Sequence, residues 1–484
     1  MLSDELLLLA SLLIFAAVLV TKVGSKLGAP SLLLFLLLGM LAGSDGLGLS
    51  FDNYELAESI GHFAMTAILF GAGLTTSWEE SKPVIRQGIL LSSLGVFLTA
   101  LLTGLFIYFT VGSLIGGIAG SLAGCLLIAA VMSSTDSASV FSILRGRRLH
   151  LRENLGPMLE LESGSNDPMA YVLTIILVDG IAAGFSSTGQ MLGHGALILL
   201  MQIAIGFAIG VLMGYVGKWL LEKIHLDSTS LYAILVLSIG YITNSFASLV
   251  HGNGLLALYV CAMFIGNRAK LDYRKDVVHF FDGITWLMQL IMFLMLGLLV
   301  RPSQMGPIIL PALLIGLFMM VIARPASVFL MLSPFRNISA RAKTLVSWVG
   351  LKGAGPILFA LCPVVEGLEG ATDIFNIVFL ISLLSLIMQG FSLAPMAHAL
   401  KLSYEEDPVV DTFGIDVPEE MGMLRDHTVT ESDLVNGGTL RDLMLPHGIR
   451  VMMVRREGKF LVPHGSMKLQ AGDKLVIIMG DTDD

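Results

Sequence analysis

The sequence predicts an all-α polytopic membrane protein that carries a small α+β domain at its C-terminal end. The chain of 484 residues is 55% hydrophobic, has a mean hydropathy of +0.81 and contains only 14% charged residues, which lies outside the range of soluble domains. Apolar stretches of about 20 residues, long enough to cross a bilayer, recur as far as residue 400. Residues 402–484 then hold 16 acidic and 8 basic side chains, which predicts a separate soluble piece.

The apolar stretches predict 13 transmembrane helices. The first stretch follows the acidic residues Asp4 and Glu5, whereas a secretory signal needs basic residues there, so we expect a retained span. The predicted spans are 5–22, 30–45, 58–76, 87–110, 115–143, 155–178, 191–217, 229–248, 252–266, 278–300, 306–331, 342–364 and 373–399.

The basic residues between these spans predict the orientation of the chain. Nearly all lie in alternate loops, and the exception is Arg301, while Arg324 and Lys352 fall inside spans. Lysine and arginine favour the cytoplasmic side, so we expect an external N-terminus and a cytoplasmic C-terminal piece. The predicted domains are a transmembrane domain at 1–401, a linker at 402–416 and a cytoplasmic domain at 417–484. The acidity of the tail argues against binding to nucleic acid or an anionic membrane surface.

Two of the spans carry sequences that weaken a helix at mid-membrane. In the fifth span, the side chains of Ser133 to Asp136 compete with the backbone for hydrogen bonds. In the twelfth span, glycines and Pro356 interrupt the segment from Gly350. The offset of seven spans makes the two segments antiparallel, which predicts two inverted repeats whose broken helices cross at a binding site.

The sixth span places polar groups on one helical face. Ser163 and Asp167 are four residues apart, as are Glu162 and Asn166. An ionisable group at this depth usually marks an ion path, and a hard monovalent cation prefers oxygen ligands. Asp167, Ser163 and the carbonyl groups near Thr135 therefore form the candidate cation site. Protons compete with cations for such a carboxylate, which predicts exchange of the two.

The roles of the other polar residues are less closely defined. Asp136 either caps a half-helix or lines the site, and Asn166 either belongs to the site or braces the fold. A buried lysine needs an anion, so we expect a structural ion pair between Lys352 and Glu162. The three cysteines lie in apolar runs without the spacing of metal ligands or of a disulfide framework.

At these motifs, residues 1–400 resemble the NhaP-type monovalent cation/proton antiporters of bacterial membranes. The similar segments are Thr135-Asp136, Glu162 to Asp167, and Gly350-Leu351-Lys352-Gly353, in which lysine replaces the family's arginine. The resemblance implies that Asp167 carries cation and proton, that Ser163 and the Thr135 carbonyl are cation ligands, and that Asn166 supports them. It also implies electroneutral exchange, a homodimer and an elevator-like movement of a six-helix core. Several relatives have an acid in the third span, where this chain has the segment from Leu69 to Gly73 without one.

The tail is similar to the C-terminal lobe of potassium-conductance regulators, the TrkA-C domain. We expect a short helix at 439–443, strands at 451–454 and 459–463 that turn at Glu457-Gly458, and a last strand after Asp473. This lobe accompanies potassium transport more often than sodium transport. The sequence contains no Gly-x-Gly-x-x-Gly after a strand, so NAD and other cofactors are not expected. A small regulator such as a nucleotide and a plain dimerisation role both remain open.

The sequence therefore predicts a potassium/proton antiporter of the bacterial inner membrane, with sodium as an alternative or additional substrate. An enzyme is not expected, because His-Glu-x-x-His and Gly-x-Ser-x-Gly motifs are missing. A cation channel gated by the tail is a third reading. Its filter would need Thr-Val-Gly-Tyr-Gly, and the nearest string, Thr110 to Ser113, lies at a span end.

Overall fold

The structure is a computed structural model that forms two compact units, residues 1–405 and 406–484. It describes residues 4–27, 30–117, 119–147, 149–183, 188–226, 228–269, 274–405, 424–434, 437–443, 449–456 and 459–479. The predicted linker begins at residue 402, but the first residues of this segment belong to the first unit. Strand β2 (Ser403–Glu405) pairs antiparallel with β1 (Leu149–Leu151) there. The rest of that linker, 406–416, lies outside the described residues.

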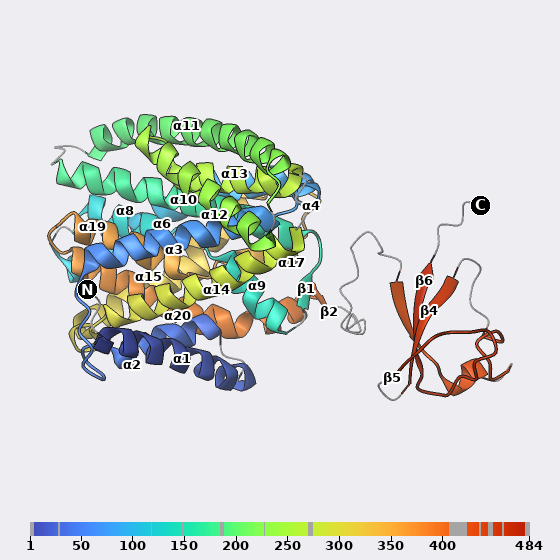
Figure 1. Ribbon diagram of the computed structural model, residues 1–484. Helices are drawn as coiled ribbons and strands as arrows, with labels where there is room; N and C mark the ends of the chain where they lie inside the picture. Colours follow the sequence, from blue (N-terminus) through green and yellow to red (C-terminus); the bar gives the residue numbers. More distant parts are fainter. Residues whose placement is uncertain are drawn as a thin grey trace. The chain divides into compact units, whose positions relative to one another are not determined.

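The first unit is built almost entirely of helices (Figure 1). Its first half contains α1 (Asp4–Leu27), α2 (Ser31–Ala42), α3 (Tyr54–Thr75), α4 (Trp78–Ser81), α5 (Ile85–Leu90), α6 (Val96–Phe106), α7 (Gly112–Ile115), α8 (Leu122–Val131), α9 (Ser137–Gly146) and α10 (Leu155–Ala182). Its second half contains α11 (Thr188–Lys223), α12 (Thr229–Leu249), α13 (Gly254–Arg268), α14 (Arg274–Leu298), α15 (Ile309–Phe318), α16 (Arg324–Met331), α17 (Ala340–Trp348), α18 (Ala354–Phe359), α19 (Leu361–Val365) and α20 (Ala371–Ala399).

Several of these helices are joined by short turns of other helical geometry. The 3₁₀ turns are η1 (Lys82–Val84), η4 (Pro302–Gln304) and η5 (Gly306–Ile308), and the π turns are η2 (Leu91–Gly95), η3 (Ile107–Val111) and η6 (Met319–Ala323). Seven helical segments of the described residues are long and apolar enough to cross a membrane. These findings confirm a mostly helical membrane unit, while the number of crossings stays a prediction.

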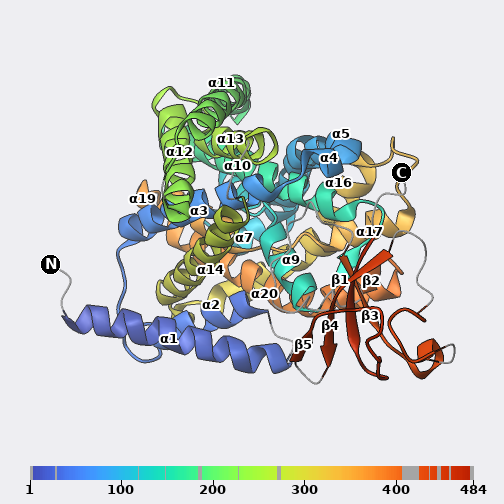
Figure 2. The same ribbon diagram turned by 45° about the vertical axis from the view of Figure 1, so that its right-hand side comes forward.

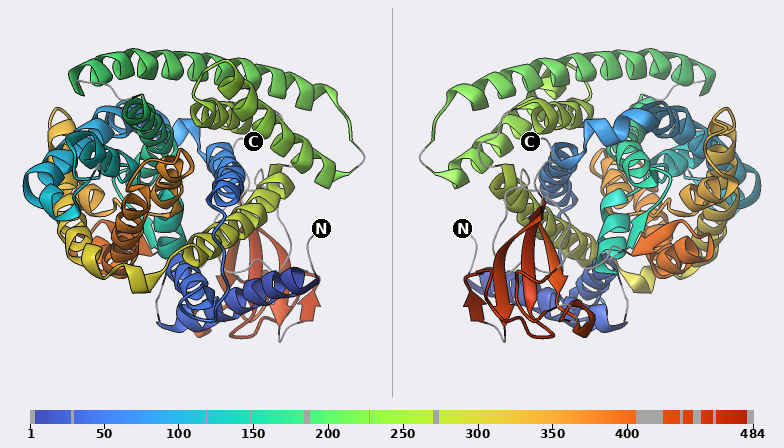
Figure 3. Two further views of the ribbon diagram at one scale, coloured as in Figure 1. Left: turned by 90° about the vertical axis from the view of Figure 1, so that its left-hand side faces the viewer. Right: turned by 90° about the vertical axis from the view of Figure 1, so that its right-hand side faces the viewer.

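The helices form two groups, which lie side by side in Figure 3. In the first, called the α3 group, α2 packs against α14, α3 packs against α13 and α14, and α12 packs against α13. In the second, called the α10 group, α6 and α10 pack against α8, α15 packs against α20, and α18 packs against α20. The long helix α11 lies along α12 and α13 of the first group and also contacts α10 (Figure 2).

Two helices of the α10 group are interrupted inside predicted spans. Residues 132–136 separate α8 from α9, and residues 349–353 separate α17 from α18. The first interruption coincides with the run of hydroxyl and acid side chains that compete for backbone hydrogen bonds. The second contains Gly350 and Gly353, which weaken a helix, and Pro356 lies in the first turn of α18, where no backbone donor is needed.

The second unit contains a four-stranded antiparallel sheet in the order β3-β6-β4-β5. The strands are β3 (Leu424–Thr428), β4 (Ile449–Arg456), β5 (Lys459–Leu461) and β6 (Lys474–Met479), and a short 3₁₀ helix, η8, spans Glu431–Leu434. The three predicted strands are present, whereas β3 was not predicted. The predicted turn at 457–458 lies outside the described residues.

The helix predicted at 439–443 is wrong for these residues. They form an isolated bridge followed by a turn, in which the Asp442 carboxylate accepts hydrogen bonds from the amide and hydroxyl of Thr439. The amides of Leu440 and Arg441 donate to the carbonyl oxygens of Met467 and Gly465, so this backbone pairs with a distant segment instead of continuing into a helix.

One ion pair joins the strands of the second unit to the turn before β6. The Asp473 carboxylate is 1% exposed and accepts bonds from Nε of Arg456 at 2.9 Å and from Nη2 at 2.6 Å. The amide of Gln470 donates to the same carboxylate at 2.8 Å. The hydrogen bond from Arg456 is the main reason why the pKa of Asp473 is below its ordinary value.

We expect Asp473→Asn to destabilise the second unit by about 2 kcal/mol at neutral pH, because Arg456 loses a charged acceptor. A carboxylate with a lowered folded-state pKa stabilises the fold above the ordinary aspartate pKa, and this contribution is lost as the pH falls through the folded-state pKa. Hydrogen exchange of the β4 and β6 amides in the full chain should be roughly thirtyfold faster in the variant at neutral pH. The two rates should converge in acid, and equal rates at neutral pH would contradict this role.

Candidate functional site

The two interrupted segments of the α10 group are hydrogen-bonded to each other at backbone groups. The amide of Asp136 donates to the carbonyl oxygen of Leu351 at 2.9 Å. In the other direction, Nζ of Lys352 donates to the carbonyl oxygen of Ser134 at 2.7 Å, and the Lys352 side chain is 2% exposed. Each interrupted segment therefore provides a hydrogen-bond partner for a backbone group of the other segment that has no helical partner.

Helix α20 satisfies further backbone groups of the second break. The amide of Lys352 donates to Oγ of Ser385 at 2.9 Å, and Nε2 of Gln389 donates to the carbonyl oxygen of Trp348 at 2.8 Å. Ser385 in turn donates to Oε1 of Gln389 at 2.5 Å, so the two side chains act as one unit. The unwound backbone between α17 and α18 is thus held by a polar pair on a neighbouring helix.

Asp136 is positioned as the cap of α9. Its carboxylate accepts the amide of Ser139 at 3.0 Å and also the Ser139 hydroxyl. On its other side the carboxylate lies directly against Gly353, where a Cβ atom would collide with it. Of the two roles that the sequence left open, this geometry favours the cap.

Two side chains of α10 hold Thr135 at the end of the first break. Ser163 donates through Oγ to the Thr135 carbonyl oxygen at 2.8 Å and accepts the amide of Ser137 at 2.9 Å. Nδ2 of Asn166 donates to Oγ1 of Thr135 at 2.5 Å. The structure therefore brings together Thr135, Ser163 and Asn166 as the sequence predicts, with Ser163 and Asn166 fixing the orientation of Thr135.

Two buried side-chain oxygens without hydrogen-bond partners belong to the first break and to α10. Among the described residues, Oγ of Ser134 and Oδ1 of Asn166 are buried and have no hydrogen-bond partner by distance and angle. A Cβ atom on Gly355 would lie 3.4 Å from Ser134 Oγ and 3.8 Å from Asp167 Oδ1, so both oxygens face the start of α18. Buried polar atoms normally have partners, and oxygen donors of this kind suit a hard monovalent cation.

The predicted ion pair between Glu162 and Lys352 needs correction. The Glu162 carboxylate pairs with the guanidinium of Arg324, and the two side chains are 1% and 4% exposed. Arg324 can reach Glu162 because of how their helices pack. Arg324 begins α16, α16 packs against η2, and η2 packs against α10, which carries Glu162. The Lys352 ammonium instead donates to the Ser134 carbonyl oxygen, and the Arg324 guanidinium supplies the positive charge that neutralises Glu162.

A cavity of about 640 Å³ leads towards one side of this site. It lies between α3, α9, α10 and α14, and its lining includes Thr75, Ser137 and the acidic residues Glu80, Glu160 and Asp282. Ser137 donates its amide to Ser163, so the cavity reaches the edge of the first break. Acidic walls raise the local concentration of cations, which suits an entry path.

The opposite side of the site is filled by rings. Tyr171, one helical turn beyond Asp167 on α10, packs its ring 5.5 Å from that of Phe359 and 5.3 Å from that of His62. On the cavity side, Leu69 and Phe70 of α3 are buried, and the Phe70 ring lies 5.4 Å from that of Phe281, which lines the cavity. The segment 69–73 therefore contributes apolar packing where several relatives have an acid.

Comparisons with known proteins identify the family. A model described as sodium/hydrogen exchanger, transmembrane, matches residues 11–399, and a TrkA-C domain model matches residues 424–483. The chain belongs to the sodium/hydrogen exchanger family. This confirms the resemblance seen in the motifs and makes the protein a multi-pass membrane transporter rather than an enzyme.

Several characterised exchangers are similar over most of the chain. The K(+)/H(+) antiporter NhaP2 of Shewanella oneidensis is 37% identical over 98% of this chain and 81% of its own length, and the K(+)/H(+) antiporter NhaP of Alkalimonas amylolytica is 35% identical over 99% and 82%. The Na(+)/H(+) antiporter NhaH of Halobacillus aidingensis is 27% identical over 65% of this chain and 76% of its own length. The sodium proton antiporter MjNhaP1 from Methanocaldococcus jannaschii, at 24% identity, has a TM-score of 0.70 over 81% of this chain and 97% of that chain, which shows a shared fold.

Some residues of this exchanger's site were missed by sequence reasoning. Arg324 falls inside a predicted span, which signals a buried acid partner, but its position in the sequence does not indicate which acid it reaches. Ser134 was part of the helix-weakening run and was not considered as a ligand. Ser385 and Gln389 gave no signal, because serine and glutamine at helical spacing in an apolar helix are common packing residues.

We expect Glu162→Gln and Arg324→Met each to destabilise this exchanger by about 3 kcal/mol, because either change leaves a buried charge unpaired. The double variant should lose much less than the sum of the two single variants. Thermal unfolding in detergent measures this, with Lys352→Met as the matched comparison. A stronger coupling of Glu162 to Lys352 than to Arg324 would restore the pairing predicted from sequence.

Proposed function

We propose that this exchanger is a potassium/proton antiporter of the bacterial cytoplasmic membrane, which also accepts sodium. The observation that carries the proposal is that the Asp167 carboxylate and the buried Ser134 hydroxyl both face Gly355 at the start of α18, and that the Ser134 hydroxyl has no hydrogen-bond partner by distance and angle. Among the described residues, no basic side chain forms an ion pair with Asp167, and the nearby Lys352 ammonium donates to the Ser134 carbonyl instead. A bound cation or proton would therefore neutralise Asp167. A buried carboxylate in this setting alternates between the two.

The exchange step follows from competition for one carboxylate. With the cation bound, Asp167, Ser134 Oγ, Asn166 Oδ1 and the second lone pair of the Thr135 carbonyl supply oxygen ligands. With a proton bound, Asp167 is neutral and the cation leaves. Because either ligand neutralises the site, both loaded forms can cross the membrane interior at much lower cost than the bare carboxylate.

The arrangement of the other acids supports an exchange of one proton for one cation. Asp136 is occupied by the amide and hydroxyl of Ser139, and Glu162 is paired with Arg324. This leaves Asp167 as the single carboxylate available to the transported ions within the described site. One carboxylate that carries either one proton or one monovalent cation gives electroneutral exchange.

The two helical groups supply a means of alternating access. The α10 group carries Asp167, and the cavity that reaches the site lies between this group and α3 and α14. Gly164 has no side chain, so the Tyr259 ring of α13 packs directly on α10 at the interface between the groups. A movement of the α10 group along the α3 group, as in an elevator, would close the cavity and open the site at the other end.

The choice of potassium is supported by the relatives and by the tail. The relatives named as potassium/proton antiporters match 98% or more of the chain, including its TrkA-C domain. We assign the cavity end to the cytoplasm from the distribution of basic residues in the sequence. A homodimer, and binding of a small regulator by the tail, belong to the same proposal.

We expect Asp167→Asn to abolish exchange, because an amide neither binds a proton in this range nor neutralises a cation. Proton flux in everted vesicles on addition of potassium, sodium, lithium or rubidium measures the exchange. Asp179→Asn is the matched control, since Asp179 is an exposed aspartate of the same helix outside the cavity lining, and it should retain exchange. Unfolding temperatures establish that both variants fold, and robust exchange by folded Asp167→Asn would overturn the proposal.

A further inference from the structure

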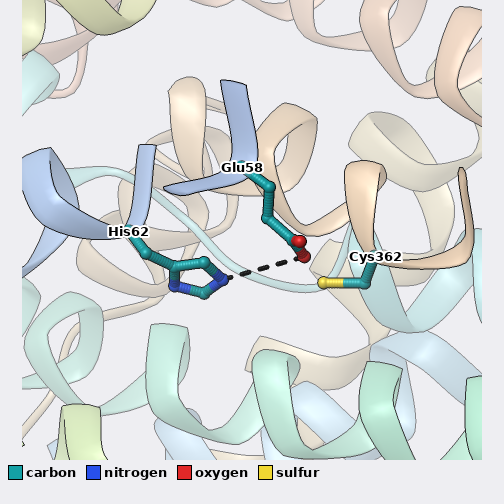
Figure 4. Close-up of side chains that lie close together, drawn as sticks. All are labelled: Glu58, His62 and Cys362. Atoms are coloured by element: carbon teal, nitrogen blue, oxygen red, sulfur yellow. Dashed lines mark ion pairs between the residues drawn. The ribbon is translucent and has the colours of Figure 1, made fainter. Parts of the chain in front are cut away.

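A second group of ligand-type side chains lies away from the proposed transport site. Glu58 and His62 are one turn apart on α3, and both point towards Cys362 of α19 (Figure 4). Nε2 of His62 lies 4.0 Å from Oε1 of Glu58, and one ligand atom from each of the three residues lies within 4.8 Å of the others. The transport mechanism proposed above uses none of these three side chains.

The group lies at the end of the helices opposite to the cavity. The cavity is lined by Thr75 and Thr76 at the end of α3, whereas Glu58 and His62 belong to its first turns. The Tyr171 ring, one turn beyond Asp167, separates the group from the transport site and contacts His62. A ligand here would therefore bind without touching the proposed cation ligands.

Solvent can reach the group from its own end of the bundle. The Glu58 and His62 side chains are 21% and 30% exposed, while Cys362 is buried. A surface hollow of about 620 Å³ begins one turn earlier on α3 and is lined by Asp52, Glu55 and Val364. Glu55 would attract a cation to the group, whereas Asp52 is paired with Arg301.

The three ligand types indicate which kind of metal ion the group would bind. Imidazole nitrogen, thiolate sulfur and carboxylate oxygen together suit Zn²⁺ and similar divalent transition metals, whereas potassium and sodium take oxygen ligands. Zinc bonds of about 2.0–2.3 Å place neighbouring ligand atoms roughly 3.5 Å apart. The present separations need side-chain rotations that bring the atoms about 1 Å closer, and water at the exposed side supplies a fourth ligand.

We propose that Glu58, His62 and Cys362 form a site for Zn²⁺ or a similar divalent metal that joins α3 to α19. Since α19 lies between α18 and α20 of the α10 group, a bound metal links the two helical groups at the end away from the cavity. Metal binding follows from the three side chains alone. Its consequence, inhibition of exchange by holding this end closed, rests on the proposed function.

Binding is tested with Co²⁺ and purified full-length protein. Wild type should show a thiolate-to-cobalt charge-transfer band that Zn²⁺ removes by displacement. We expect Cys362→Ser to lose the band and His62→Ala to weaken Co²⁺ binding at least tenfold, since each removes a metal ligand. Cys261→Ser, at a buried cysteine of α13, is the matched control and should behave as wild type. Folded wild-type protein without a charge-transfer band would overturn the site, whatever its transport activity.

The consequence is tested by adding Zn²⁺ to proteoliposomes on the side that faces the group. Exchange by wild type and by Cys261→Ser should fall at least tenfold, and exchange by Cys362→Ser should be unaffected. Unfolding temperatures and metal-free exchange rates establish that Cys362→Ser is folded and active. Metal binding without inhibition would refute the link between the helical groups, and equal inhibition of Cys362→Ser would show that Zn²⁺ acts elsewhere.

Discussion

Unwound backbone in the interior of a membrane protein must find hydrogen-bond partners within the protein, because the lipid supplies none. Here the segments 132–136 and 349–353 meet this requirement largely by binding each other and α20. The bond between the Asp136 amide and the Leu351 carbonyl fixes where the two breaks cross. The position of every proposed cation ligand follows from that crossing, since the breaks and α10 carry all of them. A functional site of this kind is therefore also a structural necessity of the fold.

The crossing also decides which charges remain free. Lys352 is committed to the Ser134 carbonyl, Asp136 to the start of α9, and Glu162 to Arg324. Each of these contacts satisfies a group whose burial alone would be costly. Asp167 forms no direct ion pair among the described residues, and this distinguishes the proposed transport group from the structural charges around it.

Sequence patterns predicted the parts of this arrangement that depend on local chemistry. The hydroxyl run at 133–136 and the glycines from Gly350 predicted both interruptions, and helical spacing predicted that Ser163 and Asn166 share one face of their helix. The pairing of Glu162 was predicted wrongly, because which basic residue reaches an acid depends on how distant helices pack, and spacing within one span carries no such information. The same limit explains why Ser385, Gln389 and the group around Cys362 were missed, since each contact joins helices far apart in the chain.

The central claim is that one carboxylate binds either a proton or the transported cation. Proton release by purified protein in weakly buffered detergent solution, recorded as potassium is added, tests it most directly. The account predicts release of about one proton for each cation bound, with apparent cation affinity that weakens as the pH falls. Cation binding that releases no proton, with an affinity independent of pH, would contradict it.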